Sequence, residues 1–175
     1  MAWLALVQSI GELIVGLIPR WILSLAYPTK NLRERVQILA YGVGPHMWVT
    51  SGNPLAIDET PIAVHSALPF NIEFEQFQDL TITLESRMIL TAKFDKSVRK
   101  TVLKRAITRL AIPEYGLSDN QAAIIRQYPS ECPTLRVNGK AHFKAPFRTF
   151  SLEFSLETRA FRYETPRLAR VHPGA

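Results

Sequence analysis

Residues 149–161 alternate between apolar and polar side chains over most of their length, and this stretch constrains the fold more than any other. The apolar positions are Phe150, Leu152, Phe154 and Leu156, and the polar positions between them are Ser151, Glu153, Ser155 and Glu157. A period of two is typical of a β-strand with one buried face and one solvated face. The pattern slips at the end, because Ala160 fits it and Phe161 does not, which predicts a bulge or a strand end near Thr158. Such a strand needs partner strands and a second layer to cover its aromatic face.

The same alternation recurs along the chain and predicts further strands. Residues 62–74 are apolar at every even-numbered position except Ser66 and are interpreted as one long strand, in which Pro69 implies an edge or a bend. Residues 53–61 are interpreted as a polar loop. Shorter alternating runs are 80–84, 88–94, 102–112 and 134–144, and the first two are close enough to form a hairpin. Gly139 interrupts the last run without changing its parity, so we expect a strand with this glycine at a bulge or a close contact.

Two segments after residue 28 are expected to be helical. Ser118 is followed three residues later by Gln121, a capping box that predicts a helix within residues 117–128, ending before Pro129. Earlier in the chain, a short amphipathic helix is predicted from the helical spacing of Leu32, Val36 and Leu39. Residues 41–45 contain two glycines and a proline and are expected to break it. About seven strands with one inserted helix indicate a mainly β, antiparallel sandwich.

The first 28 residues are hydrophobic, with Glu12 and Arg20 as their only charged side chains. Trp3 and Trp21 would lie about 27 Å apart on a helix, close to the thickness of the hydrocarbon core. The segment lacks the basic start and the cleavage site of a signal peptide. Three interpretations stay open: a membrane-spanning helix, an interfacial helix, or a helix that docks into a partner protein. The candidate anchor residues are Trp3, Leu6, Ile10, Leu13, Ile14, Leu17 and Trp21.

Positive charge gathers in two places along the chain. The net charge is +6 with a pI near 9.7, which favours acidic partners. Lys30, Arg33 and Arg35 follow the hydrophobic segment, and the positive-inside rule would place the later domain on the cytoplasmic side. A second basic run, residues 93–109, is the candidate contact for anionic lipid or an acidic partner, through Lys96, Arg99, Lys100, Lys104 and Arg105. Nucleic acid is disfavoured because Phe94 is the only aromatic residue in this run and no known binding motif occurs. The alternative is a solvated strand edge whose lysines deter aggregation.

Little in the sequence indicates catalysis. The single cysteine, Cys132, excludes a disulfide within the chain and is interpreted as a small buried residue. His65 and His142 both fall on the outward parity of strands and would be able to approach each other across a sheet. No histidine or cysteine spacing typical of a metal site occurs, so we expect no catalytic residues, no metal and no cofactor.

The order of these elements resembles the LEA14-like family of water-stress and hypersensitive-response proteins. The resemblance covers roughly residues 49–162 and is carried by Ser66-Ala67-Leu68-Pro69-Phe70-Asn71-Ile72 and, after the short helix, by Leu135-Arg136-Val137-Asn138-Gly139. It implies an immunoglobulin-like or fibronectin-like antiparallel β-sandwich, preceded in several members by one N-terminal membrane helix. It also implies protective, adaptor or lipid-contacting roles beside membranes, and it carries over no catalytic residues.

The sequence therefore predicts four regions. They are a hydrophobic helical segment (1–28), a basic amphipathic helix and linker (29–45), a β-sandwich (46–163) and a mobile basic tail (164–175). The expected function is that of a non-enzymatic, membrane-associated binding, protective or assembly module. The alternative is a structural or accessory subunit of a larger membrane or viral complex, with the N-terminal helix docked into partner proteins.

Overall fold

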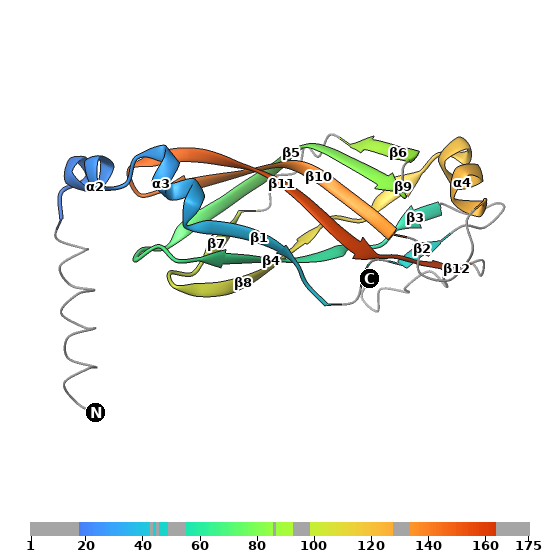
Figure 1. Ribbon diagram of the computed structural model, residues 1–175, viewed down its shortest axis with the longest axis horizontal. Coiled ribbons are helices and arrows are strands. Elements are labelled where there is room, and N and C mark those ends of the chain that lie inside the picture. The colour runs from blue at the N-terminus through green and yellow to red at the C-terminus, as the bar shows by residue number, and fades with distance from the viewer. Residues whose placement is uncertain are drawn as a thin grey trace, which may run out of the picture.

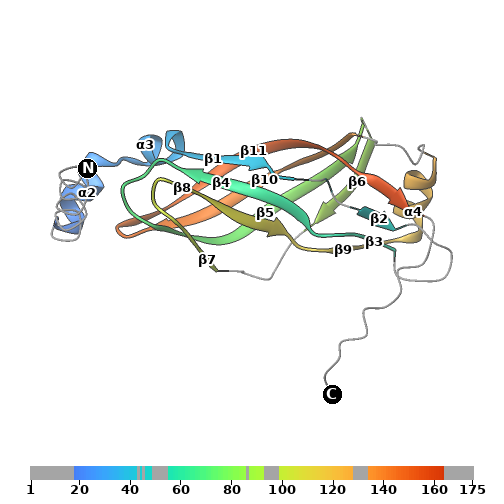
Figure 2. The ribbon, with the colours of Figure 1, turned by 90° about the horizontal axis from the view of Figure 1, so that it is seen from below.

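The computed structural model describes residues 18–42, 44, 46–48, 55–85, 87–92, 99–127 and 134–163. Most of them lie in β-strands, and the strands form two layers with helices at the two ends of the molecule (Figures 1 and 2). Helices α2 (Arg20–Ala26) and α3 (Thr29–Glu34) lie at one end, and α4 (Asp119–Arg126) lies at the other. The expectation of a mainly β, antiparallel sandwich with one helix inserted between strands is confirmed in the described residues.

The larger layer is a five-stranded antiparallel sheet. Its strand order is β11–β10–β5–β6, and β7 also pairs with β5. The strands are β5 (Ile72–Leu84), β6 (Arg87–Ala92), β7 (Lys100–Val102), β10 (Thr134–Ala145) and β11 (Arg148–Arg159). The hairpin predicted between β5 and β6 is confirmed, and Glu85 adopts a positive φ of 52° at its turn.

The second layer is made of a three-stranded sheet and a four-stranded sheet. The three-stranded sheet has the antiparallel order β1–β4–β8, with β1 (Val36–Ala40), β4 (Thr60–Ser66) and β8 (Ala106–Ile112). The four-stranded sheet has the order β12–β2–β3–β9, with β2 (His46–Trp48), β3 (Leu55–Ile57), β9 (Tyr115–Leu117) and β12 (Phe161–Tyr163). Among the strands that the structure describes in this sheet, only β12 and β2 pair in parallel. Because β3 directly precedes β4 and β9 directly follows β8, the small sheet prolongs this layer.

The alternation in residues 149–161 predicts the orientation of β11 correctly. Phe150 and Leu156 are buried, Leu152 and Phe154 are half-buried, and Glu153, Ser155 and Glu157 are exposed. β11 ends at Arg159, Ala160 is buried, and the chain then pairs with β2 in the other layer as β12. The predicted strand end near Thr158 is therefore confirmed, and its cause is a change of sheet.

Aromatic side chains fill the middle of the core. The rings of Phe143 and Phe150 stack with centroids 5.4 Å apart, and Phe74 lies 5.8 Å from Phe143 and 4.6 Å from Phe77. Burying such a side chain stabilises the fold by about 1.5–3 kcal/mol. Gly139 belongs to this packing, because a Cβ there would overlap Leu80 and lie 3.2 Å from the Phe154 ring. The predicted bulge and close contact at Gly139 are both confirmed, since the pairing of β10 with β5 shifts between Asn138 and Lys140.

Two stretches predicted as single strands are each divided between the layers. Residues 62–74 form the end of β4 and the start of β5, with Pro69 in the bend between them. Residues 102–112 comprise the end of β7 and the whole of β8, separated by a turn in which Arg105 has a φ of 47°. The single-strand interpretation is wrong because strands in facing layers bury their side chains in the same core. The alternation of apolar and polar residues therefore continues when the chain passes from one layer to the other.

The segment before the predicted sandwich also differs from expectation. α3 ends at Glu34, and Val36 and Leu39 lie in β1 rather than in an amphipathic helix. β-branched residues favour this strand, and backbone pairing aligns Val36 with Ser66 and Ile38 with Val64. The sandwich thus begins before His46. The polar loop predicted over residues 53–61 is likewise wrong in part, because it contains β3 with its buried Ala56 and Ile57.

The predicted capping box of α4 is confirmed. The Ser118 backbone N–H donates to Gln121 Oε1 at 2.7 Å, and the Gln121 N–H donates to Ser118 Oγ at 3.4 Å. In the part of the chain that the structure describes, no helix has both the length and the apolar character needed to span a bilayer. The hydrophobic segment up to residue 17 and the predicted tail (164–175) lie outside the described residues.

Candidate functional site

One end of the sandwich gathers two helices and three connections between strands; we call it the helical end. It comprises α2, α3, the β4–β5 connection, the β7–β8 turn and the β10–β11 turn (Figure 1). Phe70 lies in the β4–β5 connection. Its ring packs edge-on against the rings of Tyr27 and Phe147, with centroids 5.3 Å and 5.4 Å away. Backbone hydrogen bonds join the same parts, from the Ala67 N–H to Arg35 O at 2.8 Å and from the Arg105 N–H to Leu68 O at 3.1 Å.

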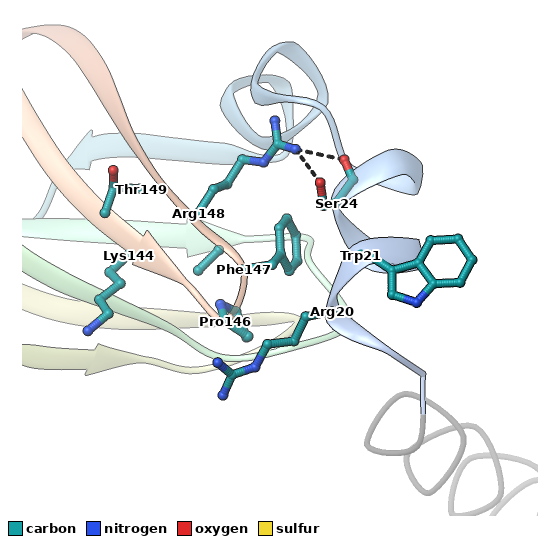
Figure 3. Close-up of a pocket in the computed structure, with 9 residues that line it drawn as sticks. Arg20, Trp21, Ser24, Lys144, Pro146, Phe147, Arg148 and Thr149 are labelled. Atoms are coloured by element: carbon teal, nitrogen blue, oxygen red, sulfur yellow. Dashed lines mark hydrogen bonds between the residues drawn. The ribbon is translucent and has the colours of Figure 1, made fainter.

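Arg148 holds the helices against the sandwich. It is the first residue of β11 and shares the inward parity of Phe150, so its side chain runs beneath the helices. Its Nη2 donates to Ser24 O at 2.8 Å and to Ser24 Oγ at 2.7 Å (Figure 3). Its Nη1 donates to Thr29 Oγ1 at 3.4 Å. All three acceptors are neutral. The Nε atom is buried and has no hydrogen-bond partner among the described residues.

A hollow of about 450 Å³ lies between α2 and the β10–β11 turn (Figure 3). Its lining contains three cations and no carboxylate, and consists of Arg20, Trp21, Ser24, Lys144, Ala145, Pro146, Phe147, Arg148 and Thr149. Within the described residues, none of the three cations has a carboxylate within 4 Å. The charged ends of these three side chains point in different directions, with Arg148 turned to Ser24 and Lys144 turned away from α2 (Figure 3).

The face of α2 that points away from the sandwich is apolar. Trp21 is 66% exposed and Leu25 is 74% exposed, with Ile22 beside them, whereas Leu23 is buried. Leu103, in the nearby β7–β8 turn, is also exposed. Exposed apolar side chains that cluster at one place mark an interaction surface more reliably than isolated ones do.

Only some of the residues predicted to contact a membrane fall within the described residues. Of the anchor candidates, Trp21 is described and exposed, and the rest (Trp3, Leu6, Ile10, Leu13, Ile14 and Leu17) lie outside the described residues, as does Lys96 of the basic run. Arg99 and Lys100 are exposed at the start of β7. Lys104 and Arg105 form the β7–β8 turn, where the Lys104 N–H donates to Asn71 Oδ1 at 2.9 Å. The structure thus brings the end of the basic run to the helical end.

Arg20, Lys144 and Arg148 were not identified from the sequence as members of a site. Arg148 and Ser24 are separated by 124 positions, and no local pattern indicates their contact. The one signal was the short Pro146-Phe147 turn, which fixes where Lys144 and Arg148 lie relative to each other. The docking of α2 determines which side chains lie beside this turn, and no local sequence pattern indicates how α2 docks.

His65 and His142, which the sequence left able to approach each other across a sheet, do not do so. His65 lies in β4 and His142 lies in β10, so they belong to different layers and both point outward. His142 Nε2 lies 2.6 Å from Gln78 Oε1, and His46 Nδ1 lies 3.9 Å from Asp58 Oδ2. Among the described residues, no group of three His, Cys, Asp or Glu side chains is placed to hold a metal ion. Cys132 and His172 lie outside the described residues.

Comparison with known proteins gives no family. No protein-family model matches the sequence, and no curated protein matches it. Among solved structures, this chain is similar to a protein from Archaeoglobus fulgidus, with 14% identity and a TM-score of 0.40 over 76% of this chain and 97% of that one. It is also similar to the ASH/PapD-like domain 7 of human CEP192, with 10% identity and a TM-score of 0.34 over 75% of this chain and 87% of that one. At these scores, neither structure identifies a ligand or a partner for this chain.

Proposed function

We propose that this chain is a non-enzymatic, membrane-associated β-sandwich that turns its helical end toward an anionic membrane surface and acts there as a binding, protective or assembly module. The observation that carries the proposal is the combination found at that end. Exposed Trp21 and Leu25 lie on the outer face of α2, and three cations without a carboxylate partner line the hollow beside it. Indole rings favour the interface between water and lipid, and cations favour anionic headgroups.

The magnitudes are sufficient for reversible binding. Each Lys or Arg near an anionic leaflet contributes about 1 kcal/mol, so Arg20, Lys144, Arg148 and the turn cation Arg105 together contribute a few kcal/mol. Burial of the exposed Trp21 and Leu25 side chains adds a hydrophobic term of similar size. Stable attachment usually combines two such signals.

The direction of the chain supports the same orientation. The hydrophobic first 17 residues directly precede α2 in the sequence, so the chain enters the described structure at its helical end. Lys30, Arg33 and Arg35 follow, and the positive-inside rule favours the cytoplasmic side for the sandwich. The LEA14-like resemblance and its immunoglobulin-like topology belong to this proposal too, since lipid-contacting roles beside membranes agree with it.

A second candidate is a subunit that docks into a partner protein. Apolar side chains are also exposed away from α2, on the outer face of the three-stranded sheet, where Leu39 is 45% exposed and Ile107 is 59% exposed. Two apolar surfaces on different faces suit a protein enclosed by partners better than one that rests on a flat bilayer.

Vesicle binding by three versions of the full chain tests the membrane proposal. Partition into neutral and anionic vesicles is measured by co-sedimentation at low and high salt. We expect stronger binding to anionic vesicles and weaker binding at high salt, because exposed charges are screened. The variant Trp21→Ser/Leu25→Ser should bind both kinds of vesicle several-fold more weakly than the unaltered chain.

The control is Leu39→Ser/Ile107→Ser, which removes two other exposed apolar side chains, on another face of the sandwich. It should bind vesicles as the unaltered chain does. Equal losses in the two double variants, or no loss in either, would refute the orientation with the helical end against the membrane. Insensitivity of every version to lipid charge would refute the electrostatic part.

A further inference from the structure

We infer that the free edge of strand β8 is a docking site for an acidic, extended segment of a partner protein, which pairs with β8 as a fourth strand of the three-stranded sheet. The inference goes beyond the proposed function, because it concerns the edge of a strand rather than the helices and needs no membrane. It is carried by the direction of the β8 backbone groups, by the residues that occupy the strand, and by the charge of residues 99–112.

β8 lies at the margin of its sheet. Its one partner among the described strands is β4, and in Figure 1 it forms the lower margin of the sandwich, below β4. The other outer strand of the sheet, β1, lies against β11 of the larger sheet. The side of β8 that faces away from β4, which we call the open side, is where a further strand can be added.

The pairing shows which β8 residues direct their backbone groups to the open side. The N–H of Ala67, directly after β4, donates to Arg35 O, so the odd-numbered residues of β4 direct their backbone groups toward β1. Pro61 fits this arrangement, because its missing N–H removes no hydrogen bond to β8. The even-numbered residues of β4 therefore bond to the even-numbered residues of β8 opposite them. The odd-numbered residues of β8 direct their backbone groups to the open side.

These residues are Ile107, Arg109 and Ala111, and all three are exposed. Each has one N–H donor and one C=O acceptor on the open side. No hydrogen bond joins these groups to another of the described elements. Regularly spaced backbone donors and acceptors along an edge are the groups to which an added strand binds.

β8 lacks most of the features that protect natural edge strands. Such strands commonly contain a proline, a bulge or an inward-facing charge. β8 has no proline, its register with β4 is continuous, and its inward-facing Thr108 and Leu110 are uncharged. Its single charged residue, Arg109, lies on the outer face, with Cζ 4.5 Å from the centroid of the Tyr41 ring. A cation on this edge repels a basic strand and attracts an acidic one.

The surrounding charge selects an acidic partner. Residues 99–112 contain five cations and no acidic residue. Opposite charges on neighbouring strands stabilise their pairing, and like charges directly opposite each other destabilise it. A second copy of this chain would bring its own Arg105 and Arg109 to the same edge, which disfavours a homodimer formed through β8. Because Thr108 and Leu110 face the core, the added strand should carry carboxylates on its outer face and apolar side chains on its inner face.

The probe is a short peptide in which glutamate and valine alternate. It is labelled with a fluorophore, titrated into the full chain in neutral detergent micelles and followed by anisotropy. A second peptide, in which lysine replaces glutamate, is titrated in the same way. We expect saturable binding of the glutamate peptide, about tenfold or more tighter than binding of the lysine peptide, and weaker binding at high salt.

Hydrogen exchange followed by NMR locates the bound peptide. At saturation, exchange at the N–H groups of Ile107, Arg109 and Ala111 should slow by about fivefold or more, because each gains a hydrogen bond. β1 is the internal control. By the same alternation, its residues Ile38 and Ala40 direct their N–H groups away from β4. Exchange at these two groups should not change when the peptide binds.

Two exposed alanines allow a matched test of backbone pairing. Ala111→Pro removes a donor on the open side of β8 and no hydrogen bond to β4, a position at which an edge strand tolerates proline. Ala40→Pro makes the same change on the outer side of β1. We expect Ala111→Pro to weaken peptide binding by about tenfold, because the proline ring also obstructs an added strand. Ala40→Pro should bind the peptide as the unaltered chain does.

Two double variants with the same change in net charge test the electrostatic part, which does not depend on tolerance of proline. Arg105→Gln/Arg109→Gln removes two exposed cations from β8 and its turn. Arg136→Gln/Lys140→Gln removes two cations from β10 in the larger sheet. The first variant should weaken binding of the glutamate peptide by about fivefold or more, and the second should leave it within about twofold.

Each outcome supports or overturns the docking site. Saturable binding with protection confined to the edge of β8 supports it. Absence of binding, equal protection of β1 and β8, or equal losses within either matched pair overturns it. Protection of β8 that rises with protein concentration when no peptide is present overturns it in favour of a second copy. These measurements contain no anionic lipid, so failure of the docking site leaves the membrane proposal standing, and failure of vesicle binding leaves the docking site standing.

Discussion

The two ends of this sandwich differ in how they treat the apolar side chains of their helices: the far end buries them, whereas the helical end exposes most of those on α2. At the far end, formed by β2, β3, β9, β12 and α4, the apolar side chains Met47, Ile57, Ala122 and Ile125 are all essentially inaccessible. α4 has a complete cap and buries two apolar residues of its own. At the helical end, α2 has no side-chain cap, buries Leu23 alone, and exposes Trp21, Ile22 and Leu25. A helix that closes a core and a helix that presents an outer surface thus occur on one domain.

Pairing between cations and carboxylates across the β10–β11 hairpin also differs between the far end and the helical end. Toward the far end, Arg136 Nη2 lies 3.0 Å from Glu157 Oε2, and Lys140 Nζ lies 3.6 Å from Glu153 Oε1. At the next comparable position toward α2, Lys144 faces Thr149. The alternation of cation and carboxylate stops where the hollow begins. Along this hairpin, the cross-strand pairs of cation and carboxylate therefore end beside the hollow, where the carboxylate opposite Lys144 is Glu73 on β5.

The largest loss of stability should come from a substitution at Gly44, where two backbone segments lie against each other near the far end. A Cβ at Gly44 would overlap Arg159 O, where β11 gives way to β12, and backbone atoms cannot move aside as a side chain can. We expect Gly44→Ala to destabilise the fold by roughly 4 kcal/mol or more, measured by urea denaturation. Gly42→Ala is the control, because Gly42 has open space around it and a φ of 75°, and should cost about 1–2 kcal/mol. Equal costs would show that the two segments are not pressed together.

A matched pair of substitutions tests the contrast between the two helices directly. Ile125→Asp in α4 places an unpaired charge in the core and should cost about 3 kcal/mol or more. Leu25→Asp in α2 should change the free energy of unfolding by less than about 0.5 kcal/mol, because this side chain is exposed. The same Leu25 variant should bind anionic vesicles more weakly. A large loss of stability in the Leu25 variant would mean that α2 also closes the core.

Removal of Arg148 should release α2 and leave the sandwich folded. Arg148→Met loses three hydrogen bonds of a charged donor and should cost about 1.5–3 kcal/mol. Hydrogen exchange at the Tyr27 N–H, which donates to Leu23 O, should accelerate far more than exchange in β10. Arg136→Met, which breaks an exposed ion pair, should cost less than about 1 kcal/mol. Uniform acceleration over the whole chain would instead make Arg148 part of the global fold.

The smallest effect on stability should come from the basic run. Arg99→Gln/Lys100→Gln should leave the melting temperature unchanged, because both side chains are exposed. Partition into anionic vesicles should fall by up to about fivefold for each charge removed, and partition into neutral vesicles should stay the same. An unchanged partition into anionic vesicles would separate this run from the membrane-facing surface. The experiment needs the full chain, because a fragment starting at His46 would lack β1 and both helices of the helical end.

Side-chain parity could be predicted from the sequence because burial on one face repeats at every second residue. Phe150, Leu156, Leu135, Val137 and Phe143 are all buried as expected. The limits of the strands could not be predicted where the chain passes between layers that share a core, as between β4 and β5. The helical spacing of Leu32, Val36 and Leu39 was misleading because distant pairing with β4 decides the conformation there.

The candidate site was much less predictable than the fold. The sequence identified the exposed Trp21 and part of the basic run. The hollow depends on Arg148 meeting Ser24 and Thr29, which follows from how α2 and α3 dock and from no local pattern. Hydrogen bonds from a cation to neutral acceptors have no recognisable sequence pattern, whereas a capping box indicates a helix start and a period of two indicates a strand.

The central place of β10 has a consequence for the time at which α2 docks. β10 lies between β5 and β11, so the larger sheet is incomplete until residues 134–159 have been synthesised. Arg148 follows Ser24 by 124 residues, which corresponds to roughly 6 to 25 seconds of translation at about 5–20 residues per second. During that interval, α2 has no Arg148 to hold it, and Trp21 and Leu25 are accessible to any surface near the ribosome. Under the membrane proposal, attachment of the N-terminal part of the chain would therefore precede folding of the sandwich.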